Sequence, residues 1–433
     1  MTPSARLSAA MEILTDIFDR RRPAADALKD WGLAHRFAGS SDRAALASLV
    51  YDTLRRKASA SWLMKDETPR GLVLGMLKLQ RNMSMEGIAE LCKEDLRFAP
   101  SPLTDHERER LTSAQIRKAP VFVQGDFPNW LSDSLTRTFG DALLKEMQYL
   151  TLRAPMDVRV NTLKTTRDDV EKAVAHLRPV QTPYSKLGLR FEVAEDGRGP
   201  ALQSEEAFQL GLYEIQDEGS QLTVALAQAV GALLGKRIVD LCAGAGGKTL
   251  ALAAALNNTG EIIATDVDTR RLAPIHQRLQ RAGITNVIVR APENRQHDAL
   301  ENVKGTADVV FIDAPCTGSG TWRRNPDAKW RLRQNSLHDR IKDQATVLER
   351  GAALLKKGGY LIYVTCSVLP EENDDAVTAF LALNKAYSTK SLENAAQTLG
   401  LDYAKLATPI GGMQLSPLRN NTDGFYMACL RKG

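Results

Sequence analysis

Apolar residues recur every three or four positions along the first hundred residues of the chain. The clearest series are Leu7, Met11, Leu14 and Phe18, followed by Leu46, Val50 and Leu54. Such a period places the side chains on one face of a helix. The N-terminal part is therefore predicted to be all-helical, and the proline-containing stretch 97–110 is predicted to be a loop or a domain boundary.

The pattern changes after residue 127. Residues 127–150 still read as helix, but Met156, Val158 and Val160 alternate with polar residues, which is typical of a strand. A second helix after a threonine cap and a second strand at 187–193 follow. This middle part is predicted to be a small mixed α/β piece.

From about residue 205 short apolar runs alternate with helical patterns. The predicted strands are 237–241, 261–267, 286–291, 308–313 and 360–366, and the predicted helices are 247–256, 269–282, 335–356 and 371–383. This alternation predicts a parallel sheet in a doubly wound α/β fold, whose ligands bind beyond the carboxyl ends of the strands.

Two further details of this part can be predicted. The apolar face of the helix at 335–356 is predicted to be Leu337, Ile341, Ala345, Leu348, Ala352 and Leu355. The sequence KKGG at 356–359 is predicted to end that helix with basic residues and a glycine cap. The last segments, MQLSPL and DGFYMACLRK, predict an antiparallel hairpin on the sheet edge.

Composition limits the class of protein. A chain of 433 residues, 43% hydrophobic and 25% charged, is typical of a globular protein with several domains, here 1–125, 126–204 and 205–433. The net charge of +5 is compatible with an anionic partner without requiring one. The sequence contains no run of about 18 apolar residues, so no membrane span is predicted. The N-terminus does not have the pattern of a signal peptide.

The five cysteines are widely spaced and form no C-x-x-C pair. This pattern supports neither a disulfide framework nor a metal centre. We expect reduced thiols, a cytoplasmic location, no bound metal and a monomeric protein.

The sequence VDLCAGAGGKT at 239–249 ends the first of these strands with an acid and a glycine-rich turn. A phosphate loop requires glycine where this chain has Cys242, and a dinucleotide fingerprint requires glycine where it has Thr249. The third possibility is a loop that binds the amino-acid part of S-adenosylmethionine through backbone N–H groups. Asp266, at the end of the next strand, is then placed to bind the ribose hydroxyls. From this motif alone, the alternative that the segment is only a tight turn between a strand and a helix is not excluded.

Two cysteines follow two later strands at the same sheet edge. Cys316 lies in DAPCTGSGTWRRNPD after 308–313, and Cys366 lies in YVTCSVLPEEN after 360–366. Each could simply be a small buried residue. Together with Asp313 they match the needs of methylation at cytosine C5, in which a thiolate adds to C6 and makes C5 nucleophilic. The chemistry alone does not decide which thiol attacks.

The stretch 205–430 resembles the RNA cytosine-5 methyltransferases of the Fmu/Sun (NOL1/NOP2/Sun) family. The resemblance rests on DLCAGAGGKT, ATDVD, DAPCTGSGTWRRNPD, YVTCSVLPEEN and DGFYMACL, with VRVNTLK and YEIQDEGSQL before them. It implies a Rossmann-like S-adenosylmethionine-dependent methyltransferase fold at 205–433. The helical part, 1–125, resembles the NusB-like RNA-binding domain of bacterial members, which leaves 126–204 as a small α/β RNA-binding linker domain.

The resemblance also implies roles for individual residues. Cys366 becomes the nucleophile, Cys316 assists release of the product, and Asp313 contacts both the target cytosine and the methyl region of the cofactor. The residues implied to bind S-adenosyl-L-methionine are Cys242, Ala243, Gly244, Ala245, Gly246, Gly247, Lys248, Asp266, Arg271, Glu293 and Asp313. Two of these depart from the family pattern, which usually has proline at Ala245 and aspartate at Glu293.

Candidate RNA contacts come from two segments. The segment 323–342 carries seven Lys or Arg residues against two Asp, with Trp322 and Trp330 near them, a composition suited to phosphate contact and base stacking. Arg323 and Arg324 are the candidate RNA contacts in this segment. The alternative is that the segment is only a solvent-exposed stretch leading into a helix. Arg159 and Asn161 are implied by the resemblance, with a structural strand as the alternative. The target cytosine is expected to be flipped or single-stranded.

The sequence therefore predicts an RNA (cytosine-5-)-methyltransferase acting on 16S ribosomal RNA. The alternatives are a transfer RNA cytosine-5 methyltransferase and a catalytically inert NusB-like RNA-binding factor. A nucleotide triphosphatase is disfavoured by Cys242 and by the lack of a magnesium-binding pattern.

Overall fold

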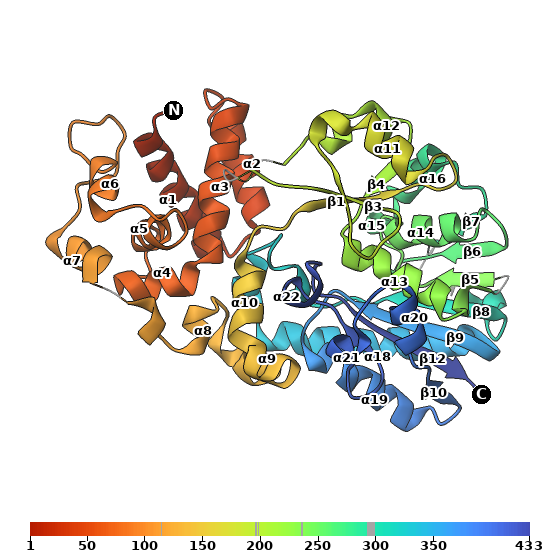
Figure 1. The fold of residues 1–433 in the computed structure, drawn as a ribbon. Helices are drawn as coiled ribbons and strands as arrows, with labels where there is room; N and C mark the ends of the chain where they lie inside the picture. Colours follow the sequence, from red (N-terminus) through yellow and green to blue (C-terminus); the bar gives the residue numbers. More distant parts are fainter. Residues whose placement is uncertain (114, 195–196, 198, 235–236, 292–298) are drawn as a thin grey trace. The chain divides into compact units, whose positions relative to one another are not determined.

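The computed structural model describes residues 1–113, 115–194, 197, 199–234, 237–291 and 299–433. Its chain forms two compact units. One is helical and comprises 1–154, 193–198 and 322–332; the other is an α/β unit comprising 155–192, 199–321 and 333–433. Each is described by itself (Figure 1).

The α/β unit contains an eight-stranded sheet with the order β10-β12-β9-β8-β5-β6-β7 and β11 beside β12. Its strands are β5 Arg237–Asp240, β6 Glu261–Ala264, β7 Val287–Val289, β8 Ala307–Asp313, β9 Leu355–Thr365, β10 Tyr387–Thr389, β11 Met413–Gln414 and β12 Tyr426–Lys432. Strands β5 to β9 pair in parallel, while β12 is antiparallel to β9, β10 and β11. The doubly wound α/β prediction is confirmed.

Helices cover both faces of this sheet because successive strand residues point to opposite sides. The helices are α13 Glu218–Ala229, α14 Gly247–Ala255, α15 Thr269–Leu272, α16 Ile275–Ala282, α18 Gln334–Leu354, α19 Asp374–Leu383, α20 Glu393–Thr398, α21 Tyr403–Leu406 and α22 Pro417–Asn420. Ile238 and Val309 pack with α13, α14 and α20, whereas Val239 and Val310 pack with α18 and α19. Figure 1 shows these helices around the strands.

A smaller antiparallel sheet precedes this fold, with the order β2-β3-β1-β4. Its elements are β1 Met156–Val160, α11 Arg167–Ala173, β2 Val180–Gln181, β3 Gly188–Phe191, α12 Glu206–Gln209 and β4 Tyr213–Ile215. Val158, Val160 and Phe191 are fully buried in its core. The mixed α/β piece predicted here is confirmed.

The structure corrects several details of the sequence prediction. The helix predicted at 269–282 is interrupted, with α16 starting after Pro274, a residue that lacks a backbone donor. Helix α18 ends at Leu354, and KKGG belongs to the run assigned to β9 rather than to a glycine cap. Strand β12 does pair with β11, but it lies inside the sheet, with β9 along one side and with β10 and β11 along the other.

The apolar face of α18 follows the prediction except at one position. Leu337, Leu348 and Ala352 are buried as expected, but Ala345 is exposed and Gln344 is buried in its place. The amide of Gln344 is needed inside, because it hydrogen-bonds buried groups near the site described below.

The helical unit forms one core from its N-terminal helices. Its helices are α1 Pro3–Arg20, α2 Ala24–Ala34, α3 Ser40–Arg55, α4 Lys57–Met64, α5 Pro69–Leu79, α6 Met85–Glu90, α7 Asp105–Ser113, α8 Val121–Gln124, α9 Ser132–Phe139, α10 Leu143–Thr151 and α17 Ala328–Arg331. Leu7, Leu14, Leu46, Val50 and Leu54 are buried in that core, as their spacing predicts.

Helix α7 lies partly in the stretch predicted as a loop. The Thr104 hydroxyl accepts from the Glu107 amide at 3.2 Å, and the Glu107 carboxylate accepts from the Thr104 amide at 2.8 Å. This reciprocal pair is a capping box, which starts a helix even in a strongly polar sequence. The motif T-x-x-E at 104–107 was the missed signal.

Residues 322–332 leave the α/β unit and belong to the helical one. Trp322 is buried, and the indole of Trp330 donates to the Leu54 carbonyl at 2.6 Å. Lys329 is 2% exposed, and its ammonium donates to the Arg55 carbonyl at 3.2 Å. Of the two tryptophans predicted to stack on RNA bases, Trp322 is therefore buried, and Trp330 is partly buried against the core of the helical unit.

Among the described residues, no helix is both long enough and apolar enough to cross a membrane.

We predict that Lys329→Met flattens the pH dependence of the helical unit's stability. Burial lowers the pKa of Lys329 to about 7, whereas an exposed lysine titrates near 10.4. The unfolded state thus binds more protons between these values, so this group adds stability as pH rises from 7 to 10, by roughly 2–4 kcal/mol. All five tryptophans lie in this unit, so urea unfolding followed by tryptophan fluorescence isolates it. An identical slope for both proteins would contradict the prediction.

Candidate functional site

The glycine loop between β5 and α14 is shaped by two left-handed residues and by Asp266. Gly244 and Gly246 have φ of 50° and 86°, a conformation that other residues rarely adopt. The Gly244 amide donates to Asp266 Oδ2 at 2.9 Å, and the Asp268 amide donates to its Oδ1 at 2.9 Å. The loop and the acid predicted to share one ligand therefore lie together at the sheet edge.

Other predicted cofactor residues surround this loop. Arg271 is largely exposed, with its guanidinium 4.0 Å from Asp266 Oδ2. The thiol of Cys242 is a neutral group, because burial and neighbouring carboxylates raise its pKa. The carbonyl of Ala245 accepts from Arg278 at 2.8 Å, which holds the turn where the family usually has proline. Glu293 lies outside the described residues.

Asp240, the last residue of β5, is a buried acid with one unused oxygen. Its Oδ2 accepts from the Thr249 hydroxyl at 2.7 Å, and its Oδ1 has no hydrogen-bond partner in the described parts of the chain. Burial, with Asp313 as a further cause, raises the pKa of Asp240 to about 7. A buried polar atom without a partner beside a ligand loop fits a cationic group of a ligand.

Asp313, the last residue of β8, is paired with the lysine of the glycine loop. Lys248 Nζ donates to Asp313 Oδ2 at 2.7 Å and lies 5.1 Å from the centre of the Phe425 ring. Lys248 is buried, whereas the Asp313 side chain is 34% exposed. The carboxylate is thus fixed in direction and still open to a ligand. The lysine of the GGKT sequence is therefore the cation of this ion pair.

The two strand-end thiols lie in contact. Cys316 Sγ is 3.4 Å from Cys366 Sγ, a hydrogen-bonding distance for sulfur. The pairing of β8 with β9 sets this distance, since Asp313 lies opposite Val364 and the Ala314 amide donates to the Val364 carbonyl at 2.8 Å. The hydrogen bond to Cys366, together with burial and the charge of Glu372, raises the pKa of Cys316 well above its usual range.

Glu372 is a site residue that sequence reasoning missed. It is fully buried, and its carboxylate accepts from the Thr317 amide at 2.8 Å, the Thr317 hydroxyl at 2.5 Å and the Gln344 amide at 3.0 Å. Burial raises its pKa despite these donors. The second acid of PEEN after the Cys366 strand was the available signal. Glu372 clamps the loop that carries Cys316.

Further hydrogen bonds tie the two cysteine loops together. Ser319 and Ser367 hydroxyls are 2.9 Å apart, and the Gly320 amide donates to the Cys366 carbonyl at 2.9 Å. Asn373 donates to the Ser367 carbonyl at 3.0 Å. The thiols are thus held on a hydrogen-bonded frame rather than on mobile loops.

Residues predicted to contact RNA form hydrogen bonds within the protein instead. Asn161 is buried and donates to the carbonyls of Gly211 and Ala282 at 2.9 and 2.8 Å. Arg159 is 5% exposed and donates to the Gly247 carbonyl at 3.0 Å. Arg323 is buried in the helical unit, whereas Arg324 is partly exposed. Burial leaves Asn161 and Arg323 no open surface for an RNA backbone.

All five cysteines are free, and no group of three His, Cys, Asp or Glu residues within the described ranges could hold a metal ion. The site therefore consists of a glycine loop, an ion-paired carboxylate and two thiols at one sheet edge. This fold and this site define an S-adenosylmethionine-dependent methyltransferase.

Comparison with known proteins agrees with this class. The family described as 16S rRNA methyltransferase RsmB/F matches residues 231–431, and the ferredoxin-like domain of RsmF/B-like methyltransferases matches 127–194. The chain is 30% identical to ribosomal RNA small subunit methyltransferase B of Sodalis glossinidius over 83% of this chain and 75% of that one. It is 28% identical to the probable ribosomal RNA small subunit methyltransferase B of Synechocystis over 99% of both.

The crystal structure of PH0851 shares the fold, with a TM-score of 0.72 and 24% identity over 100% of this chain and 99% of that one. The chain belongs to the RsmB/F methyltransferase family. The predicted cofactor, S-adenosyl-L-methionine, is the one that such enzymes use, and this prediction is confirmed.

We predict that Asp240→Asn removes a loss of stability that the wild type suffers with rising pH. The folded state holds a proton on Asp240 up to about pH 7, whereas the unfolded state releases it near pH 4. The folded state thus binds more protons between these values, so wild-type stability falls as pH rises through this range, by roughly 2–4 kcal/mol. Hydrogen exchange of peptides covering β5 and α14, measured from pH 5 to 8 without ligand, reports it. Equal pH dependence in both proteins would refute the assignment.

Proposed function

We propose that this chain transfers the methyl group of S-adenosyl-L-methionine to C5 of a cytidine in 16S ribosomal RNA, through a covalent bond between Cys366 and C6 of the base. The observation that carries the proposal is the contact of the two thiols, 3.4 Å apart, beside the Lys248–Asp313 pair. Neither a binding protein nor a structural protein needs this combination of groups.

The cofactor would lie along the glycine loop. We place its amino-acid part against the loop amides and the unused oxygen of Asp240, and its ribose at Asp266 and Arg271. Val267, which directly follows Asp266 and is 74% exposed, offers an apolar surface for a flat ring. When bound, S-adenosylmethionine supplies an electrophilic methyl group on a sulfonium.

The protein residues supply the remaining chemistry. The thiolate of Cys366 forms a bond to C6, and the electron pair of the C5–C6 double bond becomes available at C5. Asp313, directed by Lys248, binds the N3/N4 edge of the base and assists this addition by hydrogen bonding or proton donation. After methylation, the C5 proton passes to a water molecule acting as base, the electron pair of that C–H bond restores the C5–C6 double bond, and the C6–S bond breaks to release Cys366 as a thiolate.

Cys316 fits the role of a protonated partner. Its raised pKa keeps it a thiol, and its S–H can donate to the sulfur of Cys366. Such a donor stabilises the thiolate before addition and again when it leaves. This division of roles follows the assignment of Cys366 as nucleophile.

The substrate follows from the relatives. Both relatives reported above are named for ribosomal RNA of the small subunit, and the matching family is described by 16S rRNA. These names favour ribosomal over transfer RNA. We propose the helical unit and the four-stranded sheet as RNA-contacting parts, with Arg324 as a phosphate contact, and a cytoplasmic location where the thiols stay reduced.

We predict opposite effects for the two cysteine variants. With labelled cofactor and total RNA, Cys366→Ala should lower methyl transfer by about 10⁴-fold or more, because it removes the attacking atom. Cys316→Ala should instead accumulate a protein–RNA adduct on a denaturing gel, because the leaving thiolate loses its donor.

Cys92→Ala, in the core of the helical unit, is the control and should retain activity. Mapping of 5-methylcytosine then identifies the RNA. Failure of the wild type to label any RNA would overturn the proposal, and an adduct in Cys366→Ala would reverse the two thiols.

A further inference from the structure

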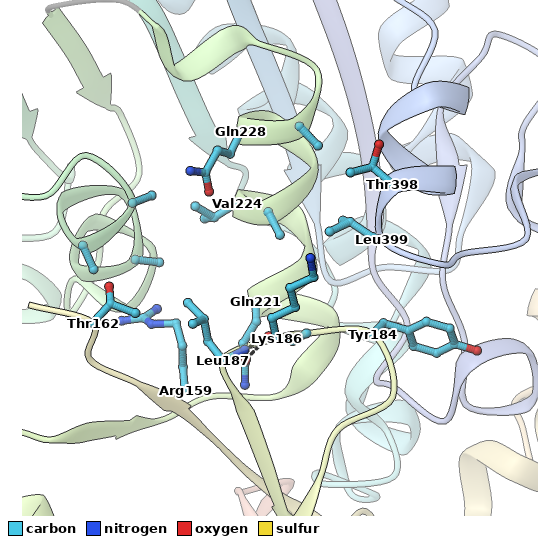
Figure 2. Close-up of a pocket in the computed structure, with 16 residues that line it drawn as sticks. Arg159, Thr162, Tyr184, Lys186, Leu187, Gln221, Val224, Gln228, Thr398 and Leu399 are labelled. Atoms are coloured by element: carbon cyan, nitrogen blue, oxygen red, sulfur yellow. Dashed lines mark hydrogen bonds between the residues drawn. The ribbon is translucent and has the colours of Figure 1, made fainter. Parts of the chain in front are cut away.

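A cavity of about 470 Å³ lies in the α/β unit, lined by α13, α14 and the β2–β3 loop (Figure 2). We call it the alanine pocket. Alanines of α13 and α14 form much of its wall, and Leu187, Val224 and Leu399 add aliphatic surface. Small side chains on two neighbouring helices leave a smooth apolar surface, and the volume is in the range of ligand sites.

Arg159 contributes a buried charge to this pocket. Its guanidinium donates from Nη1 to the Gln216 side chain at 2.5 Å and to the Gly247 carbonyl at 3.0 Å, but its Nε has no partner in the described parts of the chain. No described carboxylate lies within ion-pair distance of it. Glu214, which lies opposite Arg159 in the pairing of β1 with β4, is engaged by Arg278 and Arg281 at 2.9 and 2.5 Å.

Arg159 therefore forms no ion pair among the described residues, although the charge of Glu214 acts on it across the strands. Burial lowers the pKa of Arg159 to about 10, which shows the cost of holding its charge inside the protein. An anionic group bound in the pocket would relieve that cost. Figure 2 shows the guanidinium beside Thr162, whose hydroxyl suits an anionic oxygen.

The rest of the pocket suits a base. Lys186 extends from the β2–β3 loop alongside α13 and is exposed, and Gln228 is also exposed at the rim (Figure 2). A carboxamide can pair with the edge of a nucleobase, and an ammonium can contact phosphate. The smooth alanine wall suits a flat ring.

We infer that the alanine pocket binds one nucleotide, with its phosphate at Arg159 and its base against α13 and α14. The choice of a nucleotide over other amphipathic anions rests on the proposed function, which brings RNA to this protein. The nucleotide comes either from the substrate RNA outside the target cytidine or from a free nucleoside monophosphate. Both present the same chemistry.

The test measures binding without methylation. Cys366→Ala serves as the background, so that binding is read independently of catalysis. The probes are a fluorescently labelled single-stranded RNA pentamer, followed by anisotropy, and each of the four nucleoside 5′-monophosphates, followed by calorimetry. Ala229→Phe fills the pocket without changing charge, Lys186→Ala removes its exposed cation, and Ala379→Phe on exposed α19 is the matched control.

Ala229→Phe and Lys186→Ala should each weaken binding by about tenfold, the usual effect of losing a charge-assisted contact or its space, while Ala379→Phe changes nothing. A loss confined to the pentamer assigns the pocket to RNA, and a loss for a monophosphate assigns it to a free nucleotide. Unchanged affinity of both variants for both probes, with native circular dichroism, would overturn the inference. If the two pocket variants bind the probes more weakly but the wild type transfers no methyl group, only the proposed function is overturned.

Discussion

The parallel pairing of β8 with β9 is the constraint on which the site depends. Because the two strands run in register to Asp313 and Val364, their following loops leave the sheet side by side. Cys316 and Cys366 are 50 residues apart in sequence, yet this pairing brings their sulfurs to 3.4 Å. Strand β5 lies on the other side of β8, so the glycine loop is delivered to the same edge. A shift of register by one residue would turn every side chain to the opposite face and separate these groups.

Carboxyl groups with little access to solvent are a second feature of this edge of the sheet. Asp240, Asp313 and Glu372 place three carboxyl groups near the strand ends, with Lys248 as the cation that meets Asp313 directly. Burial raises the pKa of Asp240 and of Glu372, so the protein alone does not compensate the acids fully. A cationic cofactor supplies the missing charge under the function proposed above. The protein without cofactor is thus expected to be less stable at neutral pH than the protein with the cofactor bound.

Much of this arrangement could be predicted because it is local in sequence. Strand ends, glycine turns and the two cysteine motifs are visible as short patterns, and the parallel topology then places them at one edge. Burial of polar residues could not be predicted in this way. Gln344 replaces Ala345 inside because its amide binds Glu372 and Pro315. Trp322 is buried, and Trp330 packs partly buried against the helical core and donates to the Leu54 carbonyl. These outcomes depend on partners far away in the chain, which periodicity does not reveal.

The most direct test of the account is the pH dependence of thiol alkylation in the free protein, resolved by mass spectrometry. Cys366 should react with iodoacetamide before Cys316 between pH 6.5 and 8.5, because Cys316 keeps its proton in the hydrogen bond between them. In Cys366→Ala the reaction of Cys316 should move to lower pH, since the main cause of its raised pKa is gone. Faster alkylation of Cys316 in the wild type, or an unmoved profile in the variant, would contradict the assignment of Cys366 as nucleophile.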